Sequence, residues 1–124
     1  MRAIETEDAP APLGPYSQGI VDGDTVYVSG QGPADPDTRE VLVDTVAEQT
    51  EQTLANVAAI LEAGGTSLDN AVRATVYLMD MDDYDEMNTV YGDTFTDPYP
   101  ARTCVQVADL PAAIDVEIDV IATR

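Results

Sequence analysis

Lysine, histidine and tryptophan are absent from this chain of 124 residues, and cysteine occurs once. Without histidine, neither a Ser–His nor a Cys–His nucleophile pair can form. A zinc site would have one thiolate and no imidazole, so we expect no metal. The sequence contains no Walker-type phosphate loop and no dinucleotide-binding glycine fingerprint, so we expect no cofactor. A single cysteine cannot form an internal disulfide, which is typical of a reducing compartment.

Long apolar runs are also lacking, and the first residues, MRAIETEDAP, do not resemble a secretory signal. We therefore expect a cytoplasmic protein with no membrane partner. The five basic residues are all arginines and do not cluster, so no nucleic-acid partner is expected. The length and the hydrophobic fraction of 44% fit one globular domain spanning residues 1–124.

The formal net charge is −19, from 24 acidic residues scattered along the chain against 5 arginines. Such a charge repels itself in a folded molecule, and salt relieves the repulsion. We interpret it, together with the absence of lysine, as a halophilic adaptation to a salty cytoplasm. The plainer alternative is an acidic protein from an ordinary cytoplasm. The halophilic interpretation predicts that the fold loosens below about molar salt.

The apolar pattern changes period along the chain. Alternation predicts strands at 16–21, 25–31, 71–79, 101–107 and 113–122, and helical spacing predicts helices at 44–63 and 80–95. Asp44 or Thr45 is the expected N-cap of the first helix, and Gly64–Gly65 end it. The order β-β-α-β-α-β-β predicts an α+β fold with one mixed sheet, a βαβ crossover and both helices on one face.

A sheet covered on one face leaves the other face without a partner. The residues expected there are mostly Ser, Thr, Tyr or Cys rather than charged ones. A subunit interface is the simplest cover, so the pattern predicts a homo-oligomer.

The residues most able to carry chemistry are Arg102, Cys104 and Glu117. Alternation places Arg102 and Cys104 on one face of strand 101–107. If this strand and the last one pair as a hairpin, Arg102 and Glu117 share the face away from the core. An arginine there offers a fork for a carboxylate, and a glutamate can orient or deprotonate water.

Plainer interpretations of the same residues stay open. Arg102 and Glu117 can form an ordinary surface ion pair, which the residues alone favour. Cys104 can simply pack, as free cysteines often do. In the second predicted helix the large apolar residues belong to the core: Tyr84, Met87, Tyr91 and Phe95. Asn88, a polar residue in the middle of that helix, is predicted to face the sheet.

The segments GPYSQ, SGQ and ARTCVQVADLP, followed by VEI, occur in this order with nearly constant spacing. Together with the surrounding sequence they resemble the RidA family, also called YjgF, over almost the entire chain. The resemblance implies a chorismate-mutase-like α+β fold. It also implies a homotrimer whose sheets enclose a central barrel, with clefts between subunits. The segment TDPYPAR is shorter than in many members, which affects the rim of the cleft.

The resemblance further implies a hydrolase that deaminates reactive 2-imino acids or enamines, such as 2-iminobutanoate and 2-iminopropanoate, without metal or cofactor. Arg102 matches the carboxylate-binding arginine, and Glu117 matches the glutamate that positions water. Further substrate-binding positions in the cleft are Tyr16, Ser29, Gly30, Asn88 and Cys104. Other functions stay open: a non-catalytic trimer that binds small carboxylates as a regulator, and a ribonuclease or translation inhibitor, which the acidity disfavours. A chaperone-like role also stays open, although no single residue indicates it.

Overall fold

The computed structural model describes residues 1–124, and its sheet contains 6 strands. The strands are β1 (Arg2–Ile4), β2 (Gly19–Asp22), β3 (Thr25–Gln31), β4 (Ala71–Leu78), β5 (Ala101–Gln106) and β6 (Val116–Thr123). The helices are α1 (Val46–Ala63) and α2 (Tyr84–Thr94), and short 3-10 turns lie at Leu68–Asn70 and Met81–Asp83. No helix is both long and apolar enough to cross a lipid bilayer.

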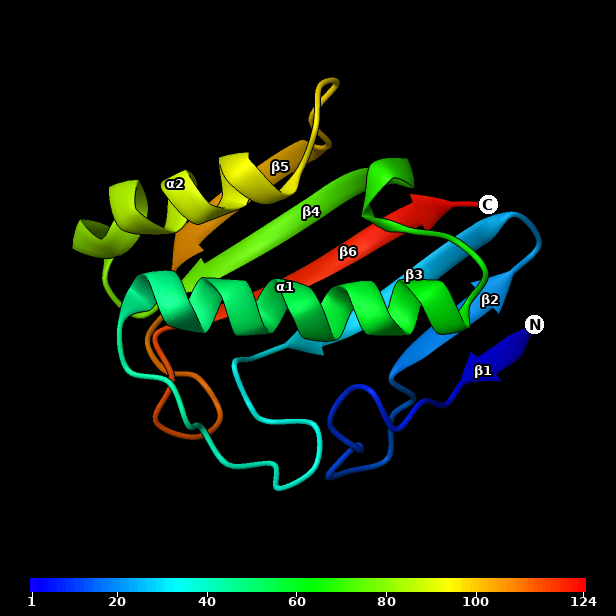
Figure 1. Cartoon of the computed structure of the whole chain (residues 1–124), viewed down its shortest axis with the longest axis horizontal. Helices are drawn as coiled ribbons and strands as arrows, with labels where there is room; N and C mark the ends of the chain where they lie inside the picture. The colour runs from blue at the N-terminus through cyan, green and yellow to red at the C-terminus, as the bar shows by residue number, and fades with distance from the viewer.

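The sheet is mixed, with the strand order β1-β2-β3-β6-β4-β5. Figure 1 shows α1 and α2 lying over the same face of this sheet. The connection β4–α2–β5 is the predicted crossover, since β4 and β5 pair in parallel, whereas the other neighbouring pairs are antiparallel. The predicted α+β class and element order are therefore confirmed, and β1 is an additional edge strand that the sequence pattern did not indicate.

The predicted hairpin between the last two strands is wrong. β6 lies between β3 and β4, and β5 pairs with β4 alone, at the edge of the sheet. Arg102 lies beside the buried Ala74 and therefore on the helix-covered face. Glu117 lies beside Tyr77, whose neighbours along β4 are buried, so Glu117 faces the opposite side. The expected shared face of Arg102 and Glu117 is thus also wrong.

Two features of the ends of α1 follow directly from the sequence. Thr45 and Glu48 form a capping box, in which the Thr45 hydroxyl accepts from the Glu48 N–H at 3.1 Å and Glu48 Oε1 accepts from the Thr45 N–H at 3.2 Å. Thr45 is thus the N-cap, one of the two candidates predicted. The helix ends at Gly64–Gly65, where a φ of +87° at Gly65 is accessible to glycine at little cost.

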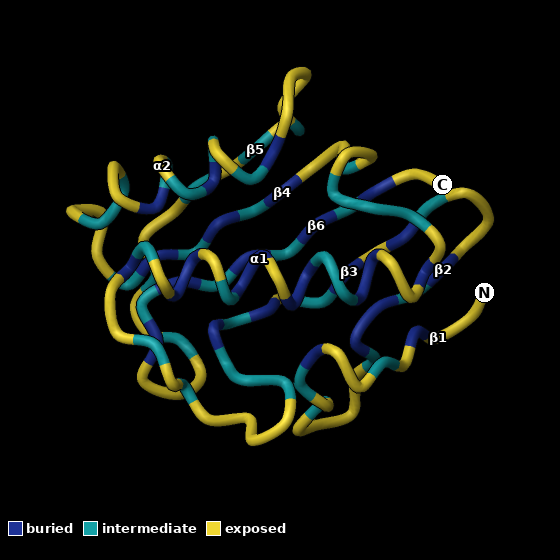
Figure 2. The backbone as a smooth tube through the Cα atoms, viewed as in Figure 1, coloured by how far each residue is buried: buried dark blue, intermediate teal, exposed yellow.

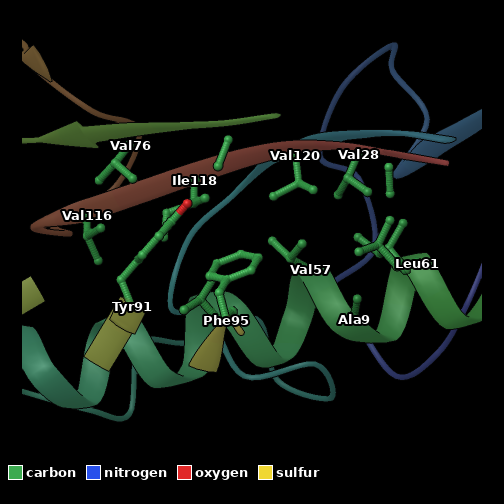
Figure 3. Packing of buried hydrophobic residues seen from close by; sticks show 14 of the residues in the cluster. Ala9, Val28, Val57, Leu61, Val76, Tyr91, Phe95, Val116, Ile118 and Val120 are labelled. Carbon is green, nitrogen blue, oxygen red and sulfur yellow. The ribbon is translucent and has the colours of Figure 1, made fainter. Parts of the chain in front are cut away.

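The core lies between α1, α2 and the central strands. Figure 2 shows burial concentrated where α1 crosses the sheet, and in Figure 3 Val57 of α1 faces Ile118 and Val120 of β6. Tyr91 of α2 and Phe95, the residue directly after this helix, complete the core, with ring centroids 4.5 Å apart. Full burial of a large apolar side chain contributes about 1.5–3 kcal/mol, so this layer fixes both helices on the sheet.

Three loops lie together at one end of the sheet: residues 5–18, 32–45 and 107–115. They run along the lower side of the view in Figure 1. Three buried side-chain amides hold them: Gln18 holds the first loop, Asn56 and Gln49 hold the second, and Gln49 also holds the third. The opposite face of the sheet has no helix and exposes 46% of Tyr27 and 37% of Val105, which agrees with the predicted uncovered face.

Candidate functional site

Arg102 extends from the edge strand β5 toward α2. Its Nη1 donates to Asn88 Oδ1 at 2.7 Å, and its Nη2 donates to the Tyr84 hydroxyl at 3.0 Å. The guanidinium carbon lies 4.7 Å from the centre of the Tyr91 ring and 5.6 Å from that of Tyr84. These partners are neutral, so they orient the arginine and leave its positive charge available for an anion.

Cys104 is half-buried and lies two residues after Arg102, on the same face of β5. Burial raises the pKa of its thiol, and the charge of Arg102 opposes this shift only in part. A thiol with a raised pKa stays protonated at neutral pH and is a poor nucleophile. The raised pKa of Cys104 thus disfavours covalent attack by this thiol.

Glu117 lies on the opposite face of the sheet, on β6. Burial raises the pKa of its carboxyl, and the neighbouring Asp119 raises it further. The Tyr77 hydroxyl donates to Asp119 Oδ2 at 2.9 Å, which keeps Asp119 on this face. A carboxylate with a raised pKa is better suited to accept a proton from water than an exposed one.

Gly30 leaves the space that Glu117 occupies. A Cβ atom at position 30 would lie 2.6 Å from Glu117 Oε2, so any other residue would displace the carboxylate. The register of the pairing between β3 and β6 shifts in this segment, between Val28 and Gln31. The strand thus presents bare backbone beside the carboxylate.

Ser29 joins this strand to the loop that carries Tyr16. Its hydroxyl donates to the Ser17 carbonyl at 2.6 Å, and its N–H donates to the Gln18 carbonyl at 2.9 Å. The Tyr16 ring is 52% exposed, which leaves it free to meet another molecule. Tyr16, Ser29, Gly30 and Glu117 therefore form one group, which we call the glutamate half-site.

The other group, the arginine half-site, consists of Tyr84, Asn88, Tyr91, Arg102 and Cys104. The structure brings the predicted Arg102, Cys104 and Asn88 together there, and it separates them from the glutamate half-site by the sheet itself. Within one chain the predicted site residues do not converge on a single point. In each half-site the charged residue, Arg102 or Glu117, stays partly exposed to solvent.

A cavity of about 170 Å³ adjoins the glutamate half-site, between the three loops. Its wall includes Tyr16 and Gly30 together with Pro33, Arg39 and Ile114. We call it the loop cavity. No group of three or more His, Cys, Asp or Glu side chains is arranged to hold a metal ion.

The amides that shape the loop cavity hold backbone carbonyls and N–H groups of the loops. Asn56 Nδ2 donates to the carbonyls of Gly32 and Ala34 at 3.0 and 2.9 Å. Gln18 Nε2 donates to the Thr6, Ala9 and Pro10 carbonyls, and Gln49 Oε1 accepts from the Asp115 N–H at 2.8 Å.

The sequence analysis missed these three amides and the role of Tyr84, which it assigned to the core. A signal was present for the amides of α1, since Gln49 and Asn56 lie seven positions apart, two helical turns, on the same face as the apolar residues of the helix.

Comparison with known proteins covers nearly the whole chain. A model of the family described as Endoribonuclease L-PSP matches residues 6–124. The 2-iminobutanoate/2-iminopropanoate deaminase of Escherichia coli strain K12 is 44% identical over 126 aligned residues, which cover 99% of this chain and 98% of that protein.

Solved structures agree in fold. The crystal structure of RidA from the Antarctic bacterium Psychrobacter sp. PAMC 21119 superposes with a TM-score of 0.96 at 43% identity and covers 100% of both chains. That of E. coli TdcF with bound serine gives a TM-score of 0.93 at 41% identity, covering 100% of this chain and 99% of TdcF.

Proposed function

Because this chain belongs to the RidA family, whose family model is described as Endoribonuclease L-PSP, we propose that it hydrolyses 2-imino acids and their enamine tautomers to 2-oxo acids and ammonia. The observation that carries the proposal is the Arg102 guanidinium, oriented by the neutral partners Asn88 and Tyr84. It offers a planar fork of donors for the carboxylate of an imino acid. A catalytic role for Arg102 and Glu117 is part of the proposal.

The two half-sites meet between subunits in this proposal. Since Arg102 and Glu117 lie on opposite faces of one sheet, a substrate can reach both only if they come from different chains. The exposed sheet face and the edge strand β5 supply the two surfaces that such a contact needs. We propose a closed homotrimer, in which each edge strand packs on the open face of the next subunit and three equivalent clefts result.

The chemistry then follows from position and charge. Arg102 binds the substrate carboxylate and so fixes the C=N carbon near the Glu117 carboxylate of the neighbouring subunit. Glu117 accepts a proton from water while the water oxygen forms a bond to that carbon. The C=N π pair moves to nitrogen, which takes up a proton from solvent and gives a carbinolamine. Orientation of this kind contributes several kcal/mol to lowering the barrier.

The second half of the reaction returns the proton. The protonated Glu117 supplies a proton to the amine nitrogen, the C–N bond breaks, and ammonia leaves as the hydroxyl oxygen loses its proton to solvent and forms the carbonyl. One water is consumed, and one 2-oxo acid and one ammonia are formed, with no oxidation. General acid–base catalysis of this type contributes typically 10²–10⁴ in rate.

The test uses 2-iminobutanoate generated in situ from threonine by a dehydratase. The appearance of 2-oxobutanoate is recorded with the wild-type protein and with Arg102→Ala, after chromatography has established the oligomeric state of both. Acceleration by the wild type and loss of most of it in Arg102→Ala, with the oligomer retained, is the expected result. Equal acceleration by both proteins would remove Arg102 from the reaction.

The variant Arg102→Lys tests whether the planar pair of donors matters in addition to the positive charge. Lysine keeps a positive charge but presents one ammonium instead of a planar pair of donors, so its activity should also fall well below that of the wild type. Full activity in this variant would mean that charge alone suffices.

A second candidate function is the binding of small carboxylates without turnover. The structure of TdcF with bound serine favours it, since serine is a small molecule that carries a carboxylate. Binding of 2-oxobutanoate by a folded, oligomeric wild-type protein that does not accelerate imine hydrolysis would support this candidate over the deaminase.

A further inference from the structure

The loop cavity extends the glutamate half-site away from the reacting carbon. Tyr16 and Gly30 line the cavity, and Gly30 is the residue whose Cα lies against the Glu117 carboxylate. A substrate with its C=N carbon near Glu117 can therefore direct its side chain into this space.

The size of the cavity exceeds what a short alkyl side chain needs. At about 30 Å³ for each water-sized group, a volume of about 170 Å³ holds roughly five such groups. The ethyl side chain of 2-iminobutanoate fills two of them. A carboxyethyl side chain has five non-hydrogen atoms and fits the available volume.

The walls are apolar at the base and carry one cation. Pro33 and Ile114 are buried in the wall, whereas the exposed Arg39 lines the same cavity. No other basic side chain lines it. A wall of this composition suits a ligand with a methylene stem and an anionic end.

Arg39 has a backbone conformation that is unusual for an arginine. Its φ is +63°, in the left-handed region that disfavours residues with a Cβ atom. Its backbone N–H donates to the Asp35 carbonyl at 2.8 Å, which holds the residue there, while its guanidinium donates no hydrogen bond within the chain. Arg39 thus lines the loop cavity with no side-chain hydrogen bond to hold it elsewhere, and it also borders a neighbouring surface hollow that contains Glu7 and Asp37.

We propose that the loop cavity and Arg39 form a subsite for a second carboxylate, so that the protein prefers dicarboxylic 2-imino acids of the 2-iminoglutarate type. The proposal rests on the proposed imine hydrolysis. The α-carboxylate binds Arg102 of one subunit, the C=N carbon lies at Glu117 of its neighbour, and the distal carboxylate binds Arg39. The net charge of −19 repels a dianionic substrate, so a local cation near each of its two carboxylates favours binding.

The experiment compares two substrates in three proteins. An amino-acid oxidase acting on glutamate or on 2-aminobutanoate generates 2-iminoglutarate or 2-iminobutanoate, with catalase present to remove peroxide. The selectivity is the ratio of kcat/KM for the dicarboxylate to that for the monocarboxylate. It is measured for the wild type, for Arg39→Gln, and for Arg2→Gln, which makes the same change in net charge on β1, outside the cavity.

The expected result is a selectivity above one in the wild type and about tenfold lower in Arg39→Gln, which corresponds to the loss of one charge-assisted contact. Arg2→Gln should keep the wild-type ratio. An equal ratio in the wild type and Arg39→Gln, or an equal fall in both variants, would overturn the subsite.

A binding measurement keeps this test separate from the deaminase proposal. Dissociation constants of 2-oxoglutarate and 2-oxobutanoate are measured by calorimetry for the same three proteins. If the wild type hydrolyses no imino acid, the deaminase proposal fails, yet a weaker binding of 2-oxoglutarate confined to Arg39→Gln would still support the subsite. Equal binding of 2-oxoglutarate by all three proteins would overturn it.

Discussion

Arg102 shows how a single charged residue can be oriented without being neutralised. Its guanidinium contacts an amide oxygen, a phenol oxygen and an aromatic ring, all of them uncharged. A carboxylate in any of these positions would have compensated the charge and competed with an anionic ligand. In a chain with 24 acidic residues, this choice of partners keeps one cation available.

The Tyr84 hydroxyl is predicted to position Arg102, and Tyr84→Phe removes it while keeping the ring. Loss of one hydrogen bond of about 1 kcal/mol predicts a KM for the imino acid about fivefold higher, with a smaller change in kcat. The melting temperature should stay nearly constant, because Tyr84 is only half-buried.

Tyr99→Phe is the matched control for this substitution. Its hydroxyl donates to the Gly92 carbonyl at 3.4 Å and has no contact with Arg102. Equal changes of KM in the two variants would show that the Tyr84 hydroxyl has no specific role.

The raised pKa of Glu117 predicts where activity is lost on the acidic side of the pH–rate profile. The active form is the anion, so activity falls as the pH drops through a pKa above the ordinary 4.5. Asp119 is one cause of this shift, and Asp119→Asn should therefore move the acidic limb of kcat/KM to lower pH. An unchanged limb in this variant, or the same limb in Glu117→Gln, would assign the titration to another group.

At the scale of single residues, the sequence identified the candidate side chains but not how they meet. Strand alternation correctly grouped Arg102 with Cys104 on one face of β5. The choice of face was wrong because an edge strand is covered only in part, so its helix-facing side can accept an arginine whose guanidinium lies over aromatic rings. Local patterns contain no information on that partial cover.

At the scale of elements, the helices and most strands were predictable because each has a clear period and a clear end. The pairing of β6 was not, since the predicted strands 101–107 and 113–122 are separated only by residues 108–112, a spacing typical of a hairpin. β6 instead inserts between β3 and β4, where its alternating Val116, Ile118 and Val120 are fully or nearly fully buried. A central strand needs an unbroken apolar side toward the core, which β6 has, whereas the helix-facing side of β5 carries Arg102 and Gln106 and suits the edge of the sheet.

The link between α1 and the loop after β3 depends on Asn56. Asn56→Ala leaves the carbonyls of Gly32 and Ala34 without their donor, which predicts a loss of about 2 kcal/mol in the free energy of unfolding. Chemical denaturation in concentrated salt measures this change.

Gln52→Ala provides the comparison for that loss. It removes the 3.0 Å hydrogen bond from Gln52 Nε2 to Asn56 Oδ1 and leaves both loop carbonyls bonded. We expect a loss below about 1 kcal/mol for this variant. A loss as large as that of Asn56→Ala would place the stabilisation within the helix rather than in its contact with the loop.

At the scale of the whole molecule, the net charge of −19 predicts a fold whose stability depends on ionic strength. The Debye length falls from about 10 Å at 0.1 M to about 3 Å at 1 M salt. The melting temperature should therefore rise steeply with potassium chloride up to about 1 M and then level off. A continued linear rise would indicate preferential exclusion of salt from the surface instead, and no rise would contradict the halophilic interpretation.

The three amides that hold the loops have a consequence for how this protein can change over time. Gln18, Gln49 and Asn56 secure their loops mainly through backbone groups, with the Asp115 carboxylate as the one side-chain partner in the loops, so the other side chains displayed there are largely free to vary. Mutations that enlarge, narrow or recharge the loop cavity can accumulate while the sheet and its two half-sites persist. A designer seeking new substrates should accordingly randomise positions 33–41 and 109–112 and leave the amides in place.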